Sequence, residues 1–308
     1  MVIGYVEELS TRISRLKRER KAVILGHNYQ DPYVQEIADF LGDSLELSKK
    51  AMSVDAEVIV FAGVSFMAEM AAILNPDRIV LHPEPSAGCP LADHLDRDVA
   101  DLYRRRYPNA PLVVYVNSHA SVKAISDYVV TSSSAVRLIS QLDSDTVLFG
   151  PDRNLASYVA EKTGKEIVPV PENGHCPVHE YLLSPYHVRL AKELHPGAKL
   201  LVHPEVRPEV RRMADFVGST SQMLKAVSSL EGELLMGTEE GLSIRARREN
   251  PGRRIFPVNP GAVCIDMKKI NLENIERALR EMGPKVKVDE RVADRVREVL
   301  TRSLEMLR

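Results

Sequence analysis

The same sets of residues recur along this chain of 308 residues with a spacing of 88. The polar columns are His27, Tyr115 and His203; Asp39, Asp127 and Asp215; Ser44, Ser132 and Thr220; and, with a slip of one residue, Cys89, Cys176 and Cys264. Short apolar runs precede the first column and the cysteines, and another run recurs between them. Ordered matches at one fixed spacing are the signature of an internal repeat. The chain is therefore predicted to fold as three copies of one unit.

Each unit is predicted to run strand, short helix, strand, helix, strand, helix, strand and loop. The strands are short apolar runs without strict alternation, which is typical of parallel strands covered on both faces. The predicted fold class is α/β, with three homologous three-layer αβα domains, small parallel sheets and a pseudo-threefold arrangement. We expect the domains at residues 20–92, 108–180 and 196–268, with terminal helices in 1–19 and 269–308 packing on the repeats.

Several helices are predicted outside or at the edges of the repeats. Connecting helices are expected at residues 91–106 and 184–194, and two tail helices at 272–282 and 290–307 that pack with the N-terminal helix. Asn154 is taken as the start signal of a helix over residues 155–162.

The overall composition excludes several classes of protein. A formal net charge of −2 without a basic tract gives no electrostatic case for nucleic acid. No apolar run reaches about 18 residues, so no membrane span is expected. The charged, amphipathic N-terminal stretch does not resemble a signal peptide. With only three cysteines, a reducing cytoplasm is expected rather than a disulfide framework.

The polar columns are predicted to lie at the carboxyl ends of the strands, where parallel α/β sheets bind ligands. Ser44, Ser132 and Thr220 each precede a predicted helix, and helix N-termini bind carboxylate or phosphate. If the three units face one another, these edges enclose one cavity suited to a small polyanion. Ordinary N-capping by the same hydroxyls is the alternative, and the two roles are compatible.

The three cysteines lie in loops that contain proline and glycine, which favours a shared site over three separately buried thiols. Structural zinc prefers four ligands in paired knuckles, and the chain has none. A [4Fe–4S] cluster takes thiolates from distant positions, and three thiolates leave one iron open as a Lewis acid. Zinc and an iron–sulfur cluster both remain candidates at this point, and an open iron beside an anion pocket favours dehydration chemistry.

The remaining histidines and one carboxylate divide into candidate site residues and others. His175 and His179 flank Cys176, either as metal ligands or as residues that shape the loop. Glu205 stands two residues after His203 and forms a candidate acid–base pair with it. Tyr29 is expected to reach the same cavity. His82, His94 and His187 have no counterpart in the repeat and are expected at the surface.

Six motifs together resemble quinolinate synthase over roughly residues 20–280. They are His27-Asn28-Tyr29-Gln30, Gly42-Asp43-Ser44, Tyr115-Val116-Asn117-Ser118, Gly150-Pro151-Asp152-Arg153-Asn154-Leu155, the run from Pro171 to His179, and His203-Pro204-Glu205. The resemblance implies three αβα domains around a [4Fe–4S] cluster with one open iron. It also implies condensation of iminosuccinate with dihydroxyacetone phosphate to quinolinate, phosphate and water, for NAD biosynthesis, with an aspartate-oxidising enzyme as the source of the imine.

The resemblance also implies a role for individual residues. Cys89, Cys176 and Cys264 would be the cluster ligands, and Glu205 would be the catalytic carboxylate, assisted by Tyr29 and His203. The residues implied to hold substrate are His27, Ser44, Tyr115, Asn117, Ser132, His203, Glu205, Ser219 and Thr220. Two alternatives remain: an aconitase-like iron–sulfur hydro-lyase acting on another small dicarboxylate, and a zinc- or cluster-binding protein without turnover.

Overall fold

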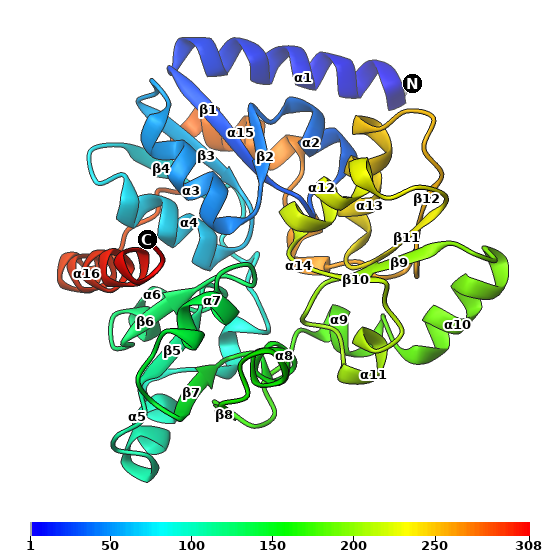
Figure 1. Ribbon diagram of the computed structural model, residues 1–308. Coiled ribbons are helices and arrows are strands. Elements are labelled where there is room, and N and C mark those ends of the chain that lie inside the picture. Colours follow the sequence, from blue (N-terminus) through cyan, green and yellow to red (C-terminus); the bar gives the residue numbers. More distant parts are fainter. Residues whose placement is uncertain (1) are drawn as a thin grey trace. The chain divides into compact units, whose positions relative to one another are not determined.

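The computed structural model describes residues 2–308, except for the side chains of residues 2, 3, 44, 45, 48, 49 and 51. It confirms an α/β fold with three four-stranded sheets, in which every pair of neighbouring strands is parallel (Figure 1). The strand orders are β2-β1-β3-β4, β6-β5-β7-β8 and β10-β9-β11-β12. Because the order is the same three times, the repeat in the sequence is a repeat of topology.

The three repeats contain the same succession of elements. The first consists of β1 (Ala22–His27), α2 (Pro32–Ile37), β2 (Phe40–Gly42), α3 (Ser44–Ser53), β3 (Val58–Ala62), α4 (Ser65–Leu74) and β4 (Ile79–Leu81). The second consists of β5 (Leu112–Tyr115), α6 (Ala120–Lys123), β6 (Tyr128–Val130), α7 (Ala135–Ser140), β7 (Thr146–Gly150), α8 (Arg153–Thr163) and β8 (Glu166–Pro169). The third consists of β9 (Lys199–Val202), α11 (Pro208–Arg211), β10 (Phe216–Val217), α12 (Thr220–Ser229), β11 (Leu234–Gly237), α13 (Glu240–Glu249) and β12 (Ile255–Pro257).

The repeated aspartates make the same contact in every repeat. The carboxylates of Asp39, Asp127 and Asp215 accept a hydrogen bond from the backbone N–H of the residue 15 positions earlier, at 2.7, 2.8 and 2.7 Å. The acceptor in each case is the residue directly before the second strand, and the donor lies in the first strand. The aspartate, which has the same place in each repeat, therefore joins the first two strands of its sheet by a hydrogen bond.

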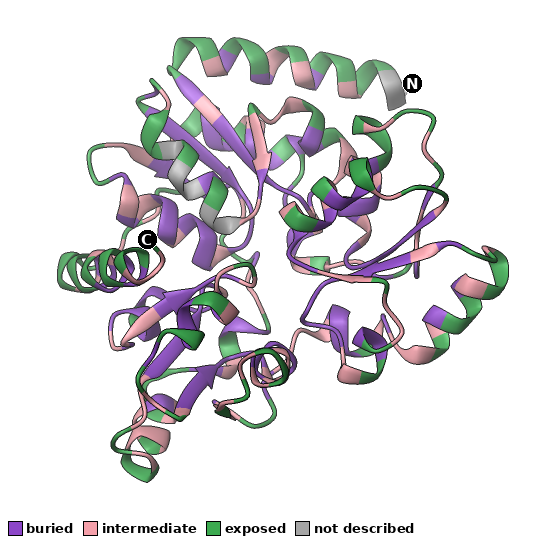
Figure 2. Cartoon of the chain, in the orientation of Figure 1, coloured by how far each residue is buried: buried purple, intermediate pink, exposed green. Residues whose placement is uncertain are grey.

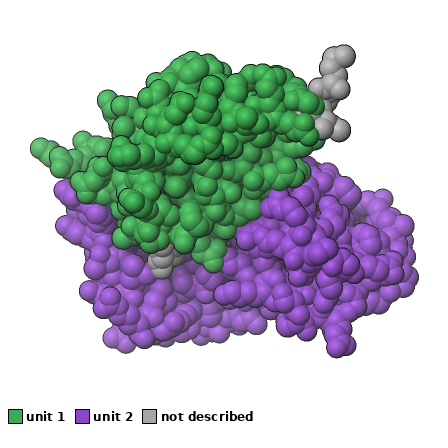
Figure 3. All heavy atoms as spheres, turned by 90° about the horizontal axis from the view of Figure 1, so that it is seen from above, with its two compact units in different colours: residues 1–89, 264–293 green, residues 90–263, 294–308 purple. Residues whose placement is uncertain are grey.

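The chain divides into two compact units, shown separately coloured in Figure 3. The first comprises residues 1–89 and 264–293 and contains the first repeat; the second comprises residues 90–263 and 294–308 and contains the other two. In both units the strands of the sheets are largely buried (Figure 2). The polar network around Glu205 described below lies within the second unit.

The first unit has its core between one sheet and two helices. Leu9 and Ile13 of α1 (Val2–Glu19) pack in one apolar cluster with Ile24 of β1 and Ile275 of α15 (Leu272–Glu281). The predicted packing of the first tail helix with the N-terminal helix is thus confirmed. The second tail helix, α16 (Glu290–Met306), contacts the second repeat. Its Ser303 accepts a hydrogen bond from the N–H of Val129 in β6, at 2.8 Å.

The connecting helices are close to their predicted places. The stretch 91–106 is a short 3₁₀ helix, η1 (Ala92–His94), followed by α5 (Arg97–Arg106). The break arises because Asp96 caps α5 by accepting a hydrogen bond from Val99 N at 2.8 Å. The other connecting helix is α10 (Pro185–Leu194), while α9 (Pro177–Tyr181) and α14 (Ile265–Lys268) directly follow two of the cysteines. None of the helices in the described part of the chain is long and apolar enough to cross a membrane.

Candidate active site

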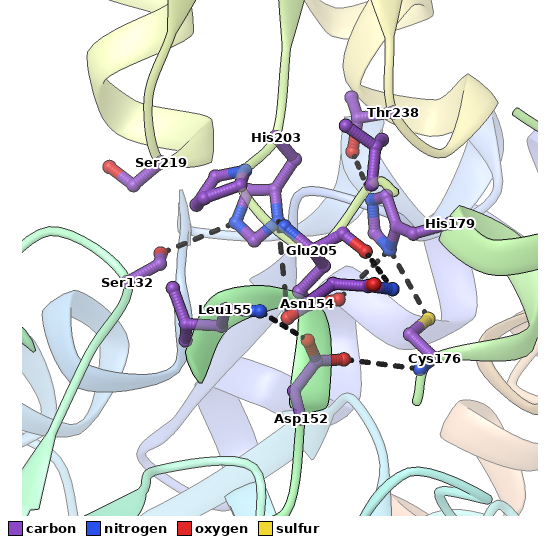
Figure 4. A network of polar contacts seen from close by, with 12 residues as sticks. Ser132, Asp152, Asn154, Leu155, Cys176, His179, His203, Glu205, Ser219 and Thr238 are labelled. Carbon is purple, nitrogen blue, oxygen red and sulfur yellow. Dashed lines mark hydrogen bonds and ion pairs between the residues drawn. The ribbon is translucent and has the colours of Figure 1, made fainter. Parts of the chain in front are cut away.

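A buried carboxylate, Glu205, lies at the centre of a polar network between the second and third sheets (Figure 4). It stands in the loop between β9 and α11, at the carboxyl end of β9. Its Oε1 accepts a hydrogen bond from the hydroxyl of Tyr115 at 2.7 Å, and its Oε2 lies 2.9 Å from Nδ1 of His179. Tyr115 ends β5, so residues from two repeats converge on one carboxylate.

His179 connects this carboxylate to a cysteine. Its Nδ1 lies 2.9 Å from Oε2 of Glu205 and 3.2 Å from Sγ of Cys176, while its Nε2 lies 2.9 Å from Oγ1 of Thr238. A carboxylate can only accept, so Nδ1 carries a proton and donates it. In the neutral imidazole Nε2 then accepts from the Thr238 hydroxyl, which fixes this tautomer.

His203 presents the opposite tautomer. Its Nδ1 accepts a hydrogen bond from the backbone N–H of Glu205 at 3.4 Å, so a neutral ring carries its proton on Nε2, which lies 3.3 Å from Oγ of Ser132. His27 of the first unit has the same arrangement, since its Nδ1 accepts from the N–H of Tyr29 at 3.2 Å. In the neutral form, His203 and His27 therefore each have an Nε2–H group that can donate a hydrogen bond just past the end of the strand.

Burial and neighbours set the charges of this network. Burial by itself would raise the pKa of Glu205, but His203, His179 and the hydrogen bonds from His179 and Tyr115 outweigh it and lower the pKa to about 2. Burial lowers the pKa of His203 to about 4, although Glu205 opposes this effect. At neutral pH Glu205 is thus a carboxylate and His203 a neutral donor.

A second buried carboxyl, Asp152, lies beside the network. Burial and the charge of Glu205 raise its pKa, against the hydrogen bonds that it accepts from backbone N–H groups. Two of these come from Leu155, at 2.7 Å, and Cys176, at 3.2 Å. Asp152 caps α8, and it ties the cysteine loop to the start of that helix.

The predicted pairing of His203 with Glu205 takes a different form in the structure. The two side chains approach only to 3.9 Å, between Nδ1 and Oε1, and the hydrogen-bond partners of the carboxylate are Tyr115 and His179 instead. The reason is the backbone: the N–H of Glu205 already occupies Nδ1 of His203.

Helix capping explains only part of the repeated set of hydroxyl residues Ser44, Ser132 and Thr220. Ser44 begins α3, as predicted, but its side chain lies outside the described residues. Ser132 lies in the loop before α7, as predicted, but the N-cap residue of this helix is Ser134, so the expectation that Ser132 itself caps the helix is wrong. In the third repeat Ser219 is the cap and accepts from Gln222 N at 3.3 Å, while Thr220 is the first helical residue.

The other predicted residues lie at the expected ends of the strands. Asn117 is half-buried two residues after β5, and Ser219 and Thr220 are buried just after β10. In the first unit, His27 ends β1, and the Tyr29 ring packs edge-on against it with centroids 4.7 Å apart.

The three cysteines are half-buried and occupy equivalent places. Each follows the fourth strand of its repeat, and Cys176 and Cys264 are both the N-cap residue of a short helix, α9 and α14. Among the described residues, the ligand atoms of Cys176, His179 and Glu205 lie within 4.8 Å of one another and could hold a metal ion. A thiol, an imidazole and a carboxylate are a donor set that zinc accepts.

Contacts and burial show where four other histidines of the sequence analysis lie. His175 shapes the cysteine loop, since its Nδ1 lies 2.7 Å from the carbonyl of Asn173 and its ring packs against Tyr181. His82 was expected at the surface, and this expectation is wrong. The residue is buried and its Nε2 lies 2.8 Å from the carbonyl of Gly63. His94 and His187 are partly exposed.

Asn154 and Thr238 belong to the network but were not predicted from the sequence as site residues. The Asn154 amide donates to the carbonyl of Glu205, at 3.0 Å, and to the carboxylate of Glu180, at 2.9 Å. Thr238 directly follows β11, so its place at the carboxyl end of a strand was the available signal.

The comparisons with known proteins cover almost the whole chain and indicate one family. The family model described as Quinolinate synthetase A protein matches residues 11–305. A quinolinate synthase of Pyrococcus horikoshii is 51% identical over 300 residues, which cover 97% of this chain and 99% of that protein. One of Pyrococcus furiosus is 50% identical, with 98% and 99% covered, and one of a Thermotoga species is 44% identical, with 96% and 98% covered.

Proposed function

Because the chain belongs to the quinolinate synthase family, we propose that it condenses iminosuccinate with dihydroxyacetone phosphate to quinolinate, phosphate and water in de novo NAD biosynthesis. The observation that supports this most is the Glu205 carboxylate, buried and ionised, with hydrogen bonds from Tyr115 and His179. Forming an aromatic ring from two small carbonyl-type substrates requires repeated removal of protons from carbon and oxygen. A buried carboxylate with a defined orientation can accept those protons once a hydrogen bond that lowers its basicity passes to the substrate.

Glu205 acts as the general base in this proposal. Hydrogen bonds to the ionised form lower its pKa, so they also lower its basicity. A substrate that takes over the Tyr115 hydroxyl removes one of those bonds and makes Glu205 a stronger base. Tyr115 then donates to substrate oxygen, and Tyr29 and His203 assist the proton transfers.

Neutral donors hold the dicarboxylate. The Nε2–H of His203 and the hydroxyl of Ser132, 3.3 Å apart, are close enough to bind the same carboxylate. The N-terminus of the ten-residue helix α12, with Ser219 and Thr220, adds backbone N–H groups of favourable polarity. His27, Ser44, Tyr115 and Asn117 complete the proposed binding set, with Glu205 facing the reacting carbon.

Cys89, Cys176 and Cys264 hold the [4Fe–4S] cluster in this proposal. Their equivalent, half-buried places after the fourth strands fit a group bound by three thiolates. When bound, such a cluster supplies an open iron that acts as a Lewis acid on a substrate oxygen. The arrangement requires that the proposed domains, residues 20–92, 108–180 and 196–268, meet around a pseudo-threefold axis.

One observation favours a second candidate function, a metal-binding protein without turnover. Cys176, His179 and Glu205 place three different donor atoms within 4.8 Å of one another. A zinc ion there would engage the carboxylate that the first proposal needs for catalysis, so the two functions exclude each other in one molecule.

The cellular setting is also part of the proposal. Iminosuccinate is unstable in water, so an aspartate-oxidising enzyme must deliver it in the same compartment, which we take to be the cytoplasm. The other partners are the two small substrates.

The Glu205→Gln variant tests the proposal. In the anaerobically prepared enzyme, the rate of quinolinate formation should fall about 10²- to 10⁴-fold, because the amide cannot accept the proton. Iron and sulfide content should stay unchanged. Glu209→Gln, an exposed carboxylate on α11, is the matched control and should keep full activity. Turnover of Glu205→Gln at the rate of the control would remove Glu205 from the mechanism.

A further inference from the structure

Arg211 is a buried arginine behind the loop that carries Glu205. It ends α11 and is only 5% exposed. Its Nη1 lies 2.9 Å from the carbonyl oxygen of Asn154, 3.0 Å from that of Val206 and 3.4 Å from that of Pro204, so its two hydrogens are shared among three acceptors. Its guanidinium also lies 5.7 Å from the centre of the Tyr158 ring. The side chain is therefore committed to the backbone on both sides of Glu205.

Every carbonyl from residue 204 to residue 206 is bonded by a side chain. Arg211 bonds those of Pro204 and Val206, and the amide of Asn154 bonds that of Glu205 at 3.0 Å. A buried carbonyl without a hydrogen-bond partner is costly, so this segment has few alternative conformations of similar energy. Its backbone also fixes His203, through the N–H of Glu205 on Nδ1.

The anchor of Arg211 lies in the second repeat. Its Nη2 donates to Oε1 of Glu161, at 2.6 Å, and to the hydroxyl of Ser157, at 3.1 Å, both on α8. Glu161 compensates the buried positive charge, which would otherwise be costly. The planar guanidinium has five donors and can bond a carboxylate and several carbonyls at once, which a lysine ammonium cannot do in the same geometry.

We propose that Arg211 is a positioning residue: by holding the carbonyls of Pro204 and Val206 against α8, it keeps the Glu205 carboxylate between Tyr115 and His179. The contacts of Arg211 are with backbone carbonyls and with Ser157, Glu161 and Tyr158, and not with the Glu205 carboxylate. A displacement of about 1 Å at a reacting group can cost roughly 10²-fold in rate, so a residue of this kind governs kcat. The inference rests on the proposed role of Glu205 as the catalytic carboxylate.

The test uses Arg211→Ala, with Arg212→Ala, its exposed neighbour, as control. Arg211→Ala enzyme with its normal iron and sulfide content should lose about 10- to 100-fold in kcat while KM for both substrates stays within about twofold. Guanidinium chloride should restore part of kcat in Arg211→Ala, because the cation can reoccupy the cavity. Sodium chloride at equal ionic strength should not, and neither salt should restore Glu205→Gln.

A second readout follows the loop itself. Hydrogen exchange of the amides in residues 203–207 should be faster in Arg211→Ala than in Arg212→Ala. If Arg211→Ala does not fold, Glu161→Gln weakens the same anchor and should lower kcat by about two- to fivefold with unchanged KM.

Two results would overturn the inference. One is a wild-type kcat in folded Arg211→Ala, or in Glu161→Gln where Arg211→Ala does not fold. The other is a loss of kcat that guanidinium does not relieve. A fully active Glu205→Gln enzyme would instead remove Glu205 from the mechanism and with it the premise of this inference, and wild-type enzyme that forms no quinolinate would refute the proposed function; both results are recognised without any Arg211 variant.

Discussion

At the scale of single residues, the pKa values of neighbouring titratable groups in the site are shifted in different directions. Glu205 remains ionised, with a pKa of about 2, whereas burial disfavours the charged forms of Asp152 and His203. Like charges in a buried site repel each other, so the charge of Glu205 and the burial of Asp152 act in the same direction on the pKa of the Asp152 carboxyl.

His82 gives a prediction for the pH dependence of stability. Burial lowers its pKa below the ordinary 6.5, against smaller opposing effects of Gly63, Glu84 and Glu69. The unfolded chain therefore binds the proton more readily than the folded one, so stability is present above about pH 6.5 and is lost as pH falls below it. His82→Gln keeps an N–H donor toward Gly63 but does not titrate.

The measurement is the unfolding midpoint of both proteins between about pH 5 and 7. The midpoint of the wild type should fall on acidification more steeply than that of His82→Gln. Equal slopes would show that the buried imidazole does not contribute to acid sensitivity.

Sequence reasoning identified the members of the site better than their contacts. Glu205, Tyr115, Ser132 and Cys176 were predicted, and they lie in or beside the network of the second unit. The partner of Glu205 could not be predicted, because hydrogen bonding of His203 to a backbone N–H depends on local loop geometry. Arg211 gave no signal at all, since an arginine in a charged stretch normally lies at the surface.

At the scale of elements, the aspartates Asp39, Asp127 and Asp215 make the same structural contact in all three repeats. Each aspartate accepts from a backbone N–H in the first strand, and two of them also pair with a basic side chain, Lys17 with Asp39 and Arg104 with Asp127. The strand order of each sheet places the first strand beside the second, so this contact fixes their register.

Asp215→Ala should test this role. It leaves the N–H of the buried Leu200 without its 2.7 Å acceptor and should lower the free energy of unfolding by about 1–3 kcal/mol. Asp127→Ala should have a similar effect. Asp143→Ala, at an exposed loop position, should change little. Urea unfolding would contradict the account if Asp215→Ala were as stable as Asp143→Ala.

Element order and type were predictable because each repeat supports the other two. Exact ends were less so: α8 begins at Arg153 with Asp152 as its cap, and not after Asn154 as predicted. Two adjacent residues of similar capping preference cannot be ranked from composition, and here the Asn154 amide is engaged elsewhere, with Glu180 and the carbonyl of Glu205.

At the scale of the whole molecule, three equivalent loops each bring one cysteine to the end of a sheet. Three copies of one unit can together supply three thiolates to a single site, whereas each unit alone offers only one. The spacing of 88 residues was visible in the sequence. Whether the three loops converge depends on how the repeats assemble, and spacing does not encode that.

The central claim, that three repeated cysteines hold one open cluster, is tested most directly by iron and sulfide analysis of anaerobically purified protein. The wild type should contain about four iron and four sulfide per chain, and Cys89→Ala, Cys176→Ala and Cys264→Ala should each lose both, together with quinolinate formation. Stoichiometric zinc without sulfide, lost in Cys176→Ala and His179→Gln but retained in Cys89→Ala and Cys264→Ala, would contradict the claim.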